Sequence, residues 1–198
     1  MHLNLQEKME TNSLVKNDSL LKSEKYLTKL TSLNQKILLK HLSWCKTARP
    51  KQITPKGEWN VWLILAGRGW GKTRTGAQDV AFYGLTKPNS RIAIVTPTFG
   101  DGRDTCIEGV SGLLTCLDPS LIDNWNRSIG ELVLKNGTIY KTFSAEQPDR
   151  LRGPQFHRAW CDELGSWKNE EAWDQLLFGL RLGEKPQVII TTTPKPTD

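Results

Sequence analysis

The chain has 198 residues, of which 37% are hydrophobic and 24% are charged, and its formal net charge at pH 7 is +6. This composition is ordinary for a soluble globular protein and allows one domain with a sizeable core. No apolar run approaches the roughly 20 residues that a membrane span needs, and residues 1–13 lack the apolar stretch of a secretory signal.

The positive charge is concentrated near the N-terminus. Residues 1–60 carry 11 Lys and Arg against 5 Asp and Glu, whereas residues 61–198 carry 16 of each. A basic arm of this kind either meets DNA phosphates or is a solvated tail, and the sequence leaves both interpretations open.

Three regions follow one another along the chain. Residues 1–24 are polar and are expected to be a disordered tail, and residues 25–58 are expected to form a helix and a linker. The helix, expected at 25–46, has leucines near helical spacing and basic residues on its other face. It either packs against the domain or touches a membrane surface or an acidic partner. Residues 59–198 are expected to form the main domain.

Within this domain, apolar runs alternate with helix-like segments, which predicts an α/β fold with a parallel, doubly wound sheet. The expected strands are 61–66, 91–97, 157–163 and 187–193, and the expected helices are 71–83, 101–116 and 169–181. Residues 131–145 are predicted to form a β-hairpin inserted into this sheet, because Asn136 and Gly137 are a strong two-residue turn signal.

The stretch LILAGRGWGKTRTG, residues 63–76, fits the phosphate-loop pattern GxxxxGK[ST] with alanine in the first place. Glycines let backbone N–H groups converge on phosphate oxygens, and the positive end of the following helix points at the same charge. Lys72 is expected to neutralise the β- and γ-phosphates, and the hydroxyl of Thr73 is expected to bind Mg²⁺. The candidate nucleotide-binding residues of the loop are Gly67, Arg68, Gly69, Trp70, Gly71, Lys72 and Thr73.

Asp162 and Glu163 end the predicted strand HRAWCDE. Two successive acids there can place one carboxylate on Mg²⁺ and the other toward an attacking water. Residues 191–193 are three threonines at the end of the last strand. They either sense the γ-phosphate or simply favour the strand.

Three arginines, Arg68, Arg150 and Arg152, are candidates for stabilising the charge that develops in phosphoryl transfer. The sequence does not choose among them. The four cysteines form no CxxC pair and the three histidines are not arranged around them, so we expect no zinc site and free thiols in a reducing cytoplasm.

Four segments together resemble the ATPase domain of large terminase subunits, the DNA-packaging motors of tailed bacteriophages and of phage-derived gene transfer agents. The segments are RPKQ at 49–52, WNVWLILAGRGWGKTRTGA at 59–77, SAEQPDRLRGPQFHRAWCDELGSW at 144–167 and VIITTTPKP at 188–196. The resemblance implies a P-loop NTPase fold of the RecA-like ASCE type.

The resemblance also implies roles for individual residues. It places Lys72 and Thr73 in Walker A, and Asp162 and Glu163 in Walker B as metal ligand and catalytic glutamate. It assigns Thr191, Thr192 and Thr193 to the motif that couples hydrolysis to DNA movement. Gln52 falls in an adenine-contacting segment, and Arg68 and Arg152 match arginine fingers that act in cis or in trans.

The activity implied is Mg²⁺-dependent ATP hydrolysis that drives double-stranded DNA into a phage or phage-like capsid. The implied partners are the portal protein, a small terminase subunit and further copies in a ring, all in the bacterial host cytoplasm and without a membrane. The alternative is a truncated, non-catalytic remnant that binds a nucleotide or a partner chain. A superfamily 2 helicase would need a second RecA-like domain.

Two features depart from the family pattern. Trp70 occupies a loop position where a small residue is usual, so its indole either faces outward or hinders closure on a nucleotide. The sequence given ends soon after the coupling motif, so we expect a sheet truncated after its fourth core strand. We also expect no nuclease activity from this chain and a nuclease domain that is absent or carried by another chain.

Overall fold

The structure, a computed structural model, describes residues 32–194. The expected tail at 1–24 and the first residues of the expected helix lie outside them. The chain divides into two units, Met1–Leu39 and Lys40–Asp198. Helix α2 (Ser32–Thr47) crosses this boundary. No helix within the described residues has both the length and the apolar character that crossing a bilayer requires.

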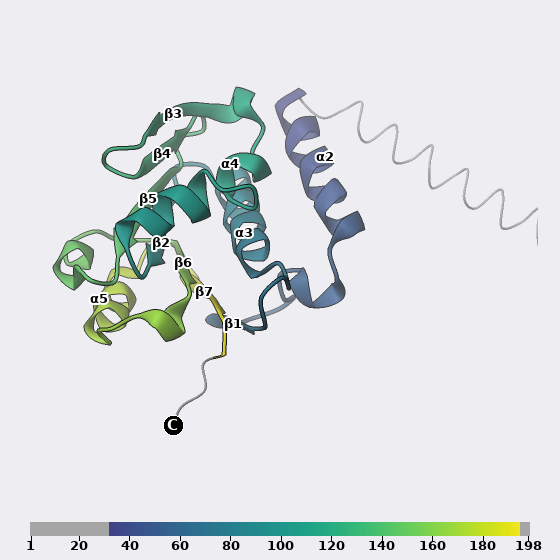
Figure 1. Cartoon of the computed structure of the whole chain (residues 1–198). Helices are drawn as coiled ribbons and strands as arrows, with labels where there is room; N and C mark the ends of the chain where they lie inside the picture. The colour runs from purple at the N-terminus through teal and green to yellow at the C-terminus, as the bar shows by residue number, and fades with distance from the viewer. Residues whose placement is uncertain (1–31, 195–198) are drawn as a thin grey trace, which may run out of the picture. The chain divides into compact units, whose positions relative to one another are not determined.

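A seven-stranded sheet forms the second unit, with the strand order β1-β7-β6-β2-β5-β4-β3 (Figure 1). The strands are β1 (Val61–Leu65), β2 (Arg91–Thr96), β3 (Ile122–Asn126), β4 (Glu131–Leu134), β5 (Ile139–Ser144), β6 (Arg158–Asp162) and β7 (Gln187–Thr192). In the sheet, the strands β1, β7, β6, β2 and β5 pair in parallel. Strand β4 pairs antiparallel with β5, and β3 pairs antiparallel with β4. The predicted α/β sheet is therefore confirmed, and so is the hairpin of β4 and β5.

One predicted element differs from the structure and one strand was not predicted. The expected helix at 101–116 is instead a π-helix, η2 (Asp101–Ile107), a turn, and a short helix, α4 (Leu113–Cys116). Glycine permits this turn, because a Cβ at Gly109 would lie 2.5 Å from the carbonyl oxygen of Thr105. Strand β3 was missed because few of its residues are apolar, and it forms by pairing with β4.

The remaining helices are short apart from one. They are α3 (Lys72–Thr86), α5 (Glu171–Gly179), and the 3₁₀ turns η1 (Pro50–Gln52), η3 (Pro119–Leu121), η4 (Pro148–Leu151) and η5 (Leu164–Ser166). Helix α3 follows β1 and α5 precedes β7, as the alternation predicted.

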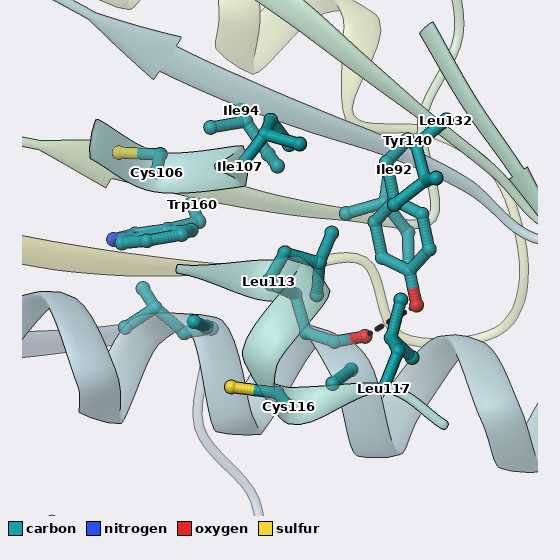
Figure 2. Close-up of a cluster of buried hydrophobic side chains, with 14 of the residues drawn as sticks. Ile92, Ile94, Cys106, Ile107, Leu113, Cys116, Leu117, Leu132, Tyr140 and Trp160 are labelled. Atoms are coloured by element: carbon teal, nitrogen blue, oxygen red, sulfur yellow. Dashed lines mark hydrogen bonds between the residues drawn. The ribbon is translucent and has the colours of Figure 1, made fainter. Parts of the chain in front are cut away.

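Alternate residues of the strands face two separate cores. On β6, Trp160 belongs to the core under α3 and α4, whereas Cys161 belongs to the core under α5. Figure 2 shows the first core, with Trp160 and Tyr140 among its largest fully buried side chains. Helix α3 approaches these rings through glycines, since a Cβ at Gly76 would lie 2.3 Å from the Trp160 indole.

A buried ion pair also ties α3 to the sheet. Arg158 on β6 donates from Nε and Nη2 to the two carboxylate oxygens of Asp79, at 2.7 and 2.8 Å. Both side chains are almost fully buried. The hydroxyl of Thr54 donates to the same carboxylate at 2.7 Å, so the segment before β1 is anchored to α3 as well.

Candidate active site

The glycine-rich loop connects β1 to α3. Strand β1 ends at Leu65 and helix α3 begins at Lys72, as the motif predicted. Gly69 and Gly71 have φ values of +74° and +88°, in the left-handed region that favours glycine. The loop therefore turns sharply just before the helix, so that its backbone leads into the positive end of α3.

A pocket of about 900 Å³ lies against this loop. Its walls come from the loop and α3, from the end of β6, from the chain after β7 and from the segment 104–111. The site residues predicted from the sequence that line it are Arg68, Gly69, Gly71, Lys72, Thr73, Glu163 and Thr193. The order β1-β7-β6 explains this meeting, because the carboxyl ends of parallel strands lie at the same edge of a sheet.

Lys72 lies between the phosphate loop and Glu163, just after the end of β6. Its Nζ donates to the carbonyl oxygen of Gly67 at 3.2 Å and lies 3.8 Å from Oε1 of Glu163. The side chain is 8% exposed, whereas that of Glu163 is 35% exposed. The ammonium group is thus buried between a loop carbonyl and a carboxylate that faces the pocket.

Glu163 has an unusual backbone conformation. Its φ of 47° and ψ of 46° are in the left-handed region, which a residue with a side chain adopts at a cost of order 1–3 kcal/mol. Its carboxylate accepts hydrogen bonds from the Thr193 backbone N–H at 3.0 Å and from the Thr193 hydroxyl at 2.9 Å. These bonds fix the direction of the carboxylate beside Lys72.

Asp162 is buried behind Glu163. Its oxygens accept hydrogen bonds from the Thr191 hydroxyl at 2.5 Å and from the Cys106 thiol at 3.4 Å. The Trp160 indole donates in turn to the Thr191 hydroxyl at 2.7 Å. Burial raises the pKa of Asp162 to about 6, although the hydrogen bonds from Thr191 and Cys106 act in the opposite direction.

Each of the three threonines holds a different part of the acidic turn. Thr191 bonds the first carboxylate and Thr193 the second, and the Thr192 hydroxyl accepts a hydrogen bond from the Gly165 backbone at 3.0 Å. The sequence did not assign these separate partners, because they depend on the register of β7 against β6.

The oxygen donors at the site suit Mg²⁺. Thr73 lines the pocket, and the buried Asp162 directly precedes Glu163, although Asp162 is not itself among the lining residues. Magnesium prefers such hard oxygen ligands and keeps several waters. A cation beside Asp162 would also offset the cost of burying its charge, so the residues present fit the metal.

The predicted arginines are placed differently. Arg68 is exposed on the phosphate loop and lines the pocket, and Arg150 is exposed on η4. Arg152 is not among the pocket residues: its guanidinium pairs with Glu171 at 2.8 Å and Asp149 at 3.3 Å. Within this chain, the geometry brings Arg68 alone of the three to the pocket wall.

Gln52 and Trp70 also lie outside the pocket wall. Gln52 is buried, and its amide contacts the loop from behind. The Trp70 indole is partly buried and packs toward the core, with the Arg49 guanidinium 5.0 Å from its ring. Trp70 is thus not among the residues that line the pocket beside the phosphate loop.

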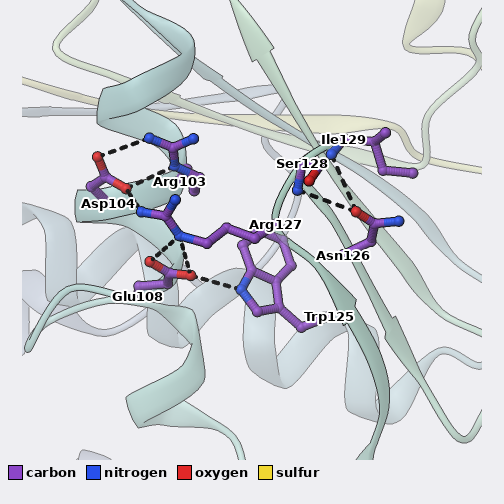
Figure 3. A network of polar contacts seen from close by, with 8 residues as sticks. All are labelled: Arg103, Asp104, Glu108, Trp125, Asn126, Arg127, Ser128 and Ile129. Carbon is purple, nitrogen blue, oxygen red and sulfur yellow. Dashed lines mark hydrogen bonds and ion pairs between the residues drawn. The ribbon is translucent and has the colours of Figure 1, made fainter.

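An ionic network at the rim of the pocket was not anticipated (Figure 3). Asp104, which lines the pocket, accepts from Arg103 at 2.8 Å and from Arg127 at 2.7 Å. The Glu108 carboxylate accepts hydrogen bonds from the Arg127 guanidinium and from the Trp125 indole. The network connects η2 and the residue that follows it to the end of β3 and the residue that follows that strand. Charged residues scattered over two segments gave no sequence signal for it.

The sheet order and the glycine turn between β1 and α3 define a P-loop fold of the RecA-like class. The family described as "Terminase large subunit, T4likevirus-type, N-terminal" matches residues 63–198. The chain belongs to this family of large terminase subunits, which confirms the resemblance found in the sequence.

Solved terminase structures share the fold. The ATPase domain of the Thermus phage P74-26 large terminase is 18% identical, with a TM-score of 0.55 over 70% of this chain and 61% of that one. The large terminase of a second thermophilic bacteriophage, in complex with ADP, is 16% identical, with a TM-score of 0.59 over 79% of this chain and 38% of that one. The HK97 bacteriophage large terminase is 17% identical, with a TM-score of 0.52 over 83% and 33%.

This chain thus spans less than two thirds of the length of each of these solved chains. A comparison with curated protein sequences found no significant match.

Proposed function

We propose that this chain is an Mg²⁺-dependent ATPase and that its hydrolysis of ATP powers DNA packaging. The observation that carries the proposal is the position of Lys72, held between the Gly67 carbonyl and the Glu163 carboxylate in one open pocket. A buried ammonium group can bind the phosphates of a nucleoside triphosphate. A carboxylate opposite it can activate the water that attacks the γ-phosphate. Solved relatives in complex with ADP and with ATP-γ-S support a nucleotide as the ligand.

The residues divide the work between binding and chemistry. The backbone of residues 67–71 and the Lys72 ammonium would hold the phosphates, and Arg68 lies where its charge could add to theirs. Thr73 and Asp162 would hold Mg²⁺, which neutralises phosphate charge when bound. Glu163, oriented by Thr193, would position the attacking water and accept its proton.

The partners follow from the family rather than from the geometry. We propose double-stranded DNA as the cargo and the portal protein, the small terminase subunit and further copies of this chain as partners, in the host cytoplasm. Arg152, which is exposed and forms surface ion pairs with Asp149 and Glu171, is the candidate finger for a neighbouring copy. The proposal does not extend to DNA cleavage.

Two substitutions test the chemistry. Lys72→Ala should abolish phosphate release and weaken ATP binding, because it removes the buried cation beside the phosphate loop. Glu163→Gln should bind ATP with near-normal affinity but lower turnover by at least about a hundredfold, since it leaves water without its base. Phosphate release and nucleotide binding by calorimetry measure the two effects.

Lys168→Ala is the matched control, because Lys168 is an exposed lysine on the surface that pairs with Glu146. Unchanged turnover in Lys72→Ala or in Glu163→Gln would refute the assignment. Binding of ATP by the unaltered chain without phosphate release, alone or with a terminase partner, would favour the alternative of a non-catalytic remnant.

A further inference from the structure

The turn before β1 is built around one glutamine. Gln52 closes η1 (Pro50–Gln52), and its Oε1 accepts a hydrogen bond from the Arg49 backbone N–H at 3.0 Å. The side chain is 7% exposed although it is polar, so its hydrogen bonds must be made within the protein. The turn is therefore a rigid unit with Arg49 at one end and Gln52 at the other.

Both ends of this turn donate to the same atom of the phosphate loop. The carbonyl oxygen of Trp70 accepts from Nη2 of Arg49 and, at 3.2 Å, from Nε2 of Gln52. Nε2 also lies 3.2 Å from the hydroxyl oxygen of Thr75 in the first turn of α3. The Thr75 hydroxyl donates to the Gly71 carbonyl at 2.9 Å. The amide nitrogen has two hydrogens, and both are used by these contacts.

Steric contacts reinforce the hydrogen bonds. A Cβ at Gly71 would lie 2.8 Å from Nε2 of Gln52, so the turn and the loop are in close contact at a residue whose φ of +88° also favours glycine. The Arg49 guanidinium stacks over the Trp70 indole, which holds that large side chain on the side of the loop away from the pocket.

We infer that Arg49 and Gln52 are positioning residues that brace the phosphate loop from behind. This inference rests on the proposed function and deepens it. Because both amide hydrogens of Gln52 bind protein atoms, its effect on a nucleotide passes through the loop and thus through the phosphates. The family resemblance implies instead a contact between Gln52 and the adenine base. The two roles differ in what they predict for a ligand that has no base.

The test compares MgATP with Mg²⁺ and inorganic tripolyphosphate, bound to the full chain and measured by calorimetry. Gln52→Met keeps the length of the side chain and removes both donors. Arg49→Lys keeps the charge and removes the planar fork. Each variant should weaken the binding of ATP and of tripolyphosphate by the same factor, about tenfold for the loss of its hydrogen bond to the Trp70 carbonyl. Thr54→Val is the matched control, since it frees the same segment from α3 without touching the loop.

The outcomes separate the possibilities. A loss of ATP binding with unchanged tripolyphosphate binding in Gln52→Met assigns the residue to the base and overturns the inference, as do unchanged affinities for both ligands. If Gln52→Met does not fold, the exposed Arg49→Lys decides by the same comparison. If the unaltered chain binds neither ligand, the proposed function itself fails.

Discussion

Asp162 is the residue whose surroundings conflict most with its charge. It is buried on a central strand, and its carboxylate relies on Thr191 and Cys106 for hydrogen bonds. Burial raises its pKa to about 6 from an ordinary value of 3.8. In the unfolded chain the carboxyl loses its proton at a lower pH. The folded chain therefore loses stability as the pH rises from about 4 to above 6.

Replacing this acid should make the chain more stable. Asp162→Asn removes the buried charge, so at pH 8 and without divalent cations we expect the free energy of unfolding to rise by about 1–2 kcal/mol. Near pH 4, where the acid is protonated, the variant and the unaltered chain should differ little. Urea unfolding in EDTA at both pH values measures this.

Asp123→Asn, on the exposed face of β3, controls for the loss of a negative charge. An equal gain at pH 4 and pH 8 in Asp162→Asn would contradict the explanation by burial.

At the scale of elements, α3 is positioned by small residues against large rings. A Cβ at Gly76 would lie 2.3 Å from the Trp160 indole, and one at Gly84 would lie 2.2 Å from the Tyr140 hydroxyl oxygen. Since Trp160 also donates to Thr191, the depth at which α3 packs is linked to the acidic turn. Helix α3 and the site are therefore held by the same ring.

Gly76→Ala should destabilise the chain, although alanine favours a helix by up to about 1 kcal/mol relative to glycine. The added methyl group overlaps the indole, and overpacking typically costs 1–3 kcal/mol, so we expect a net loss of about 1–2 kcal/mol in the free energy of unfolding. Urea unfolding measures the change. The cost should shrink in a Trp160→Phe background, which opens space beside the helix. Equal costs in the two backgrounds would rule out the overlap as the cause.

The elements that the sequence predicted best are those with a strong local pattern. Strands β1, β2 and β7 are apolar runs, and Asn136 and Gly137 marked the hairpin of β4 and β5. Strand β3 and the π-helix η2 were not predicted, because strand pairing and backbone packing override weak local preferences. Strand β3 depends on pairing with the next strand, β4, and η2 packs against the distant residue Thr142 through Gly102.

The candidate site was predictable to a similar degree. The glycine motif indicated the loop, and the strand order then brought Glu163 and Thr193 to its pocket. The sequence did not predict side-chain directions or local backbone conformations. The contact of Gln52 with a loop carbonyl and the αL conformation of Glu163 both depend on tertiary geometry.

At the scale of the whole sheet, β1 is the terminal strand and is exposed. Val61, Leu63 and Leu65 are 48%, 54% and 58% exposed on one face of it. Among the described residues, β7 is the strand paired with β1, so its other edge carries unpaired backbone groups. An exposed apolar edge strand is a typical site of self-association.

Leu63→Glu should therefore reduce association of the chain at high concentration while leaving its thermal midpoint nearly unchanged, because the side chain is already largely in solvent. Light scattering over a concentration series measures the association. Ile129→Glu, at an exposed apolar residue beyond β3, is the control and should have little effect. Equal scattering from Leu63→Glu and the unaltered chain would exclude β1 as the contact.

Strand β7 has a consequence for how the molecule can move. It is hydrogen-bonded on one side to the strand that carries the phosphate loop and on the other to the strand that carries the acids. A slip of β7 by two residues would release the Thr193 grip on Glu163 and disturb the base of the loop in a single event. The two halves of the pocket are thus both hydrogen-bonded to β7, so a shift of this strand would affect both of them.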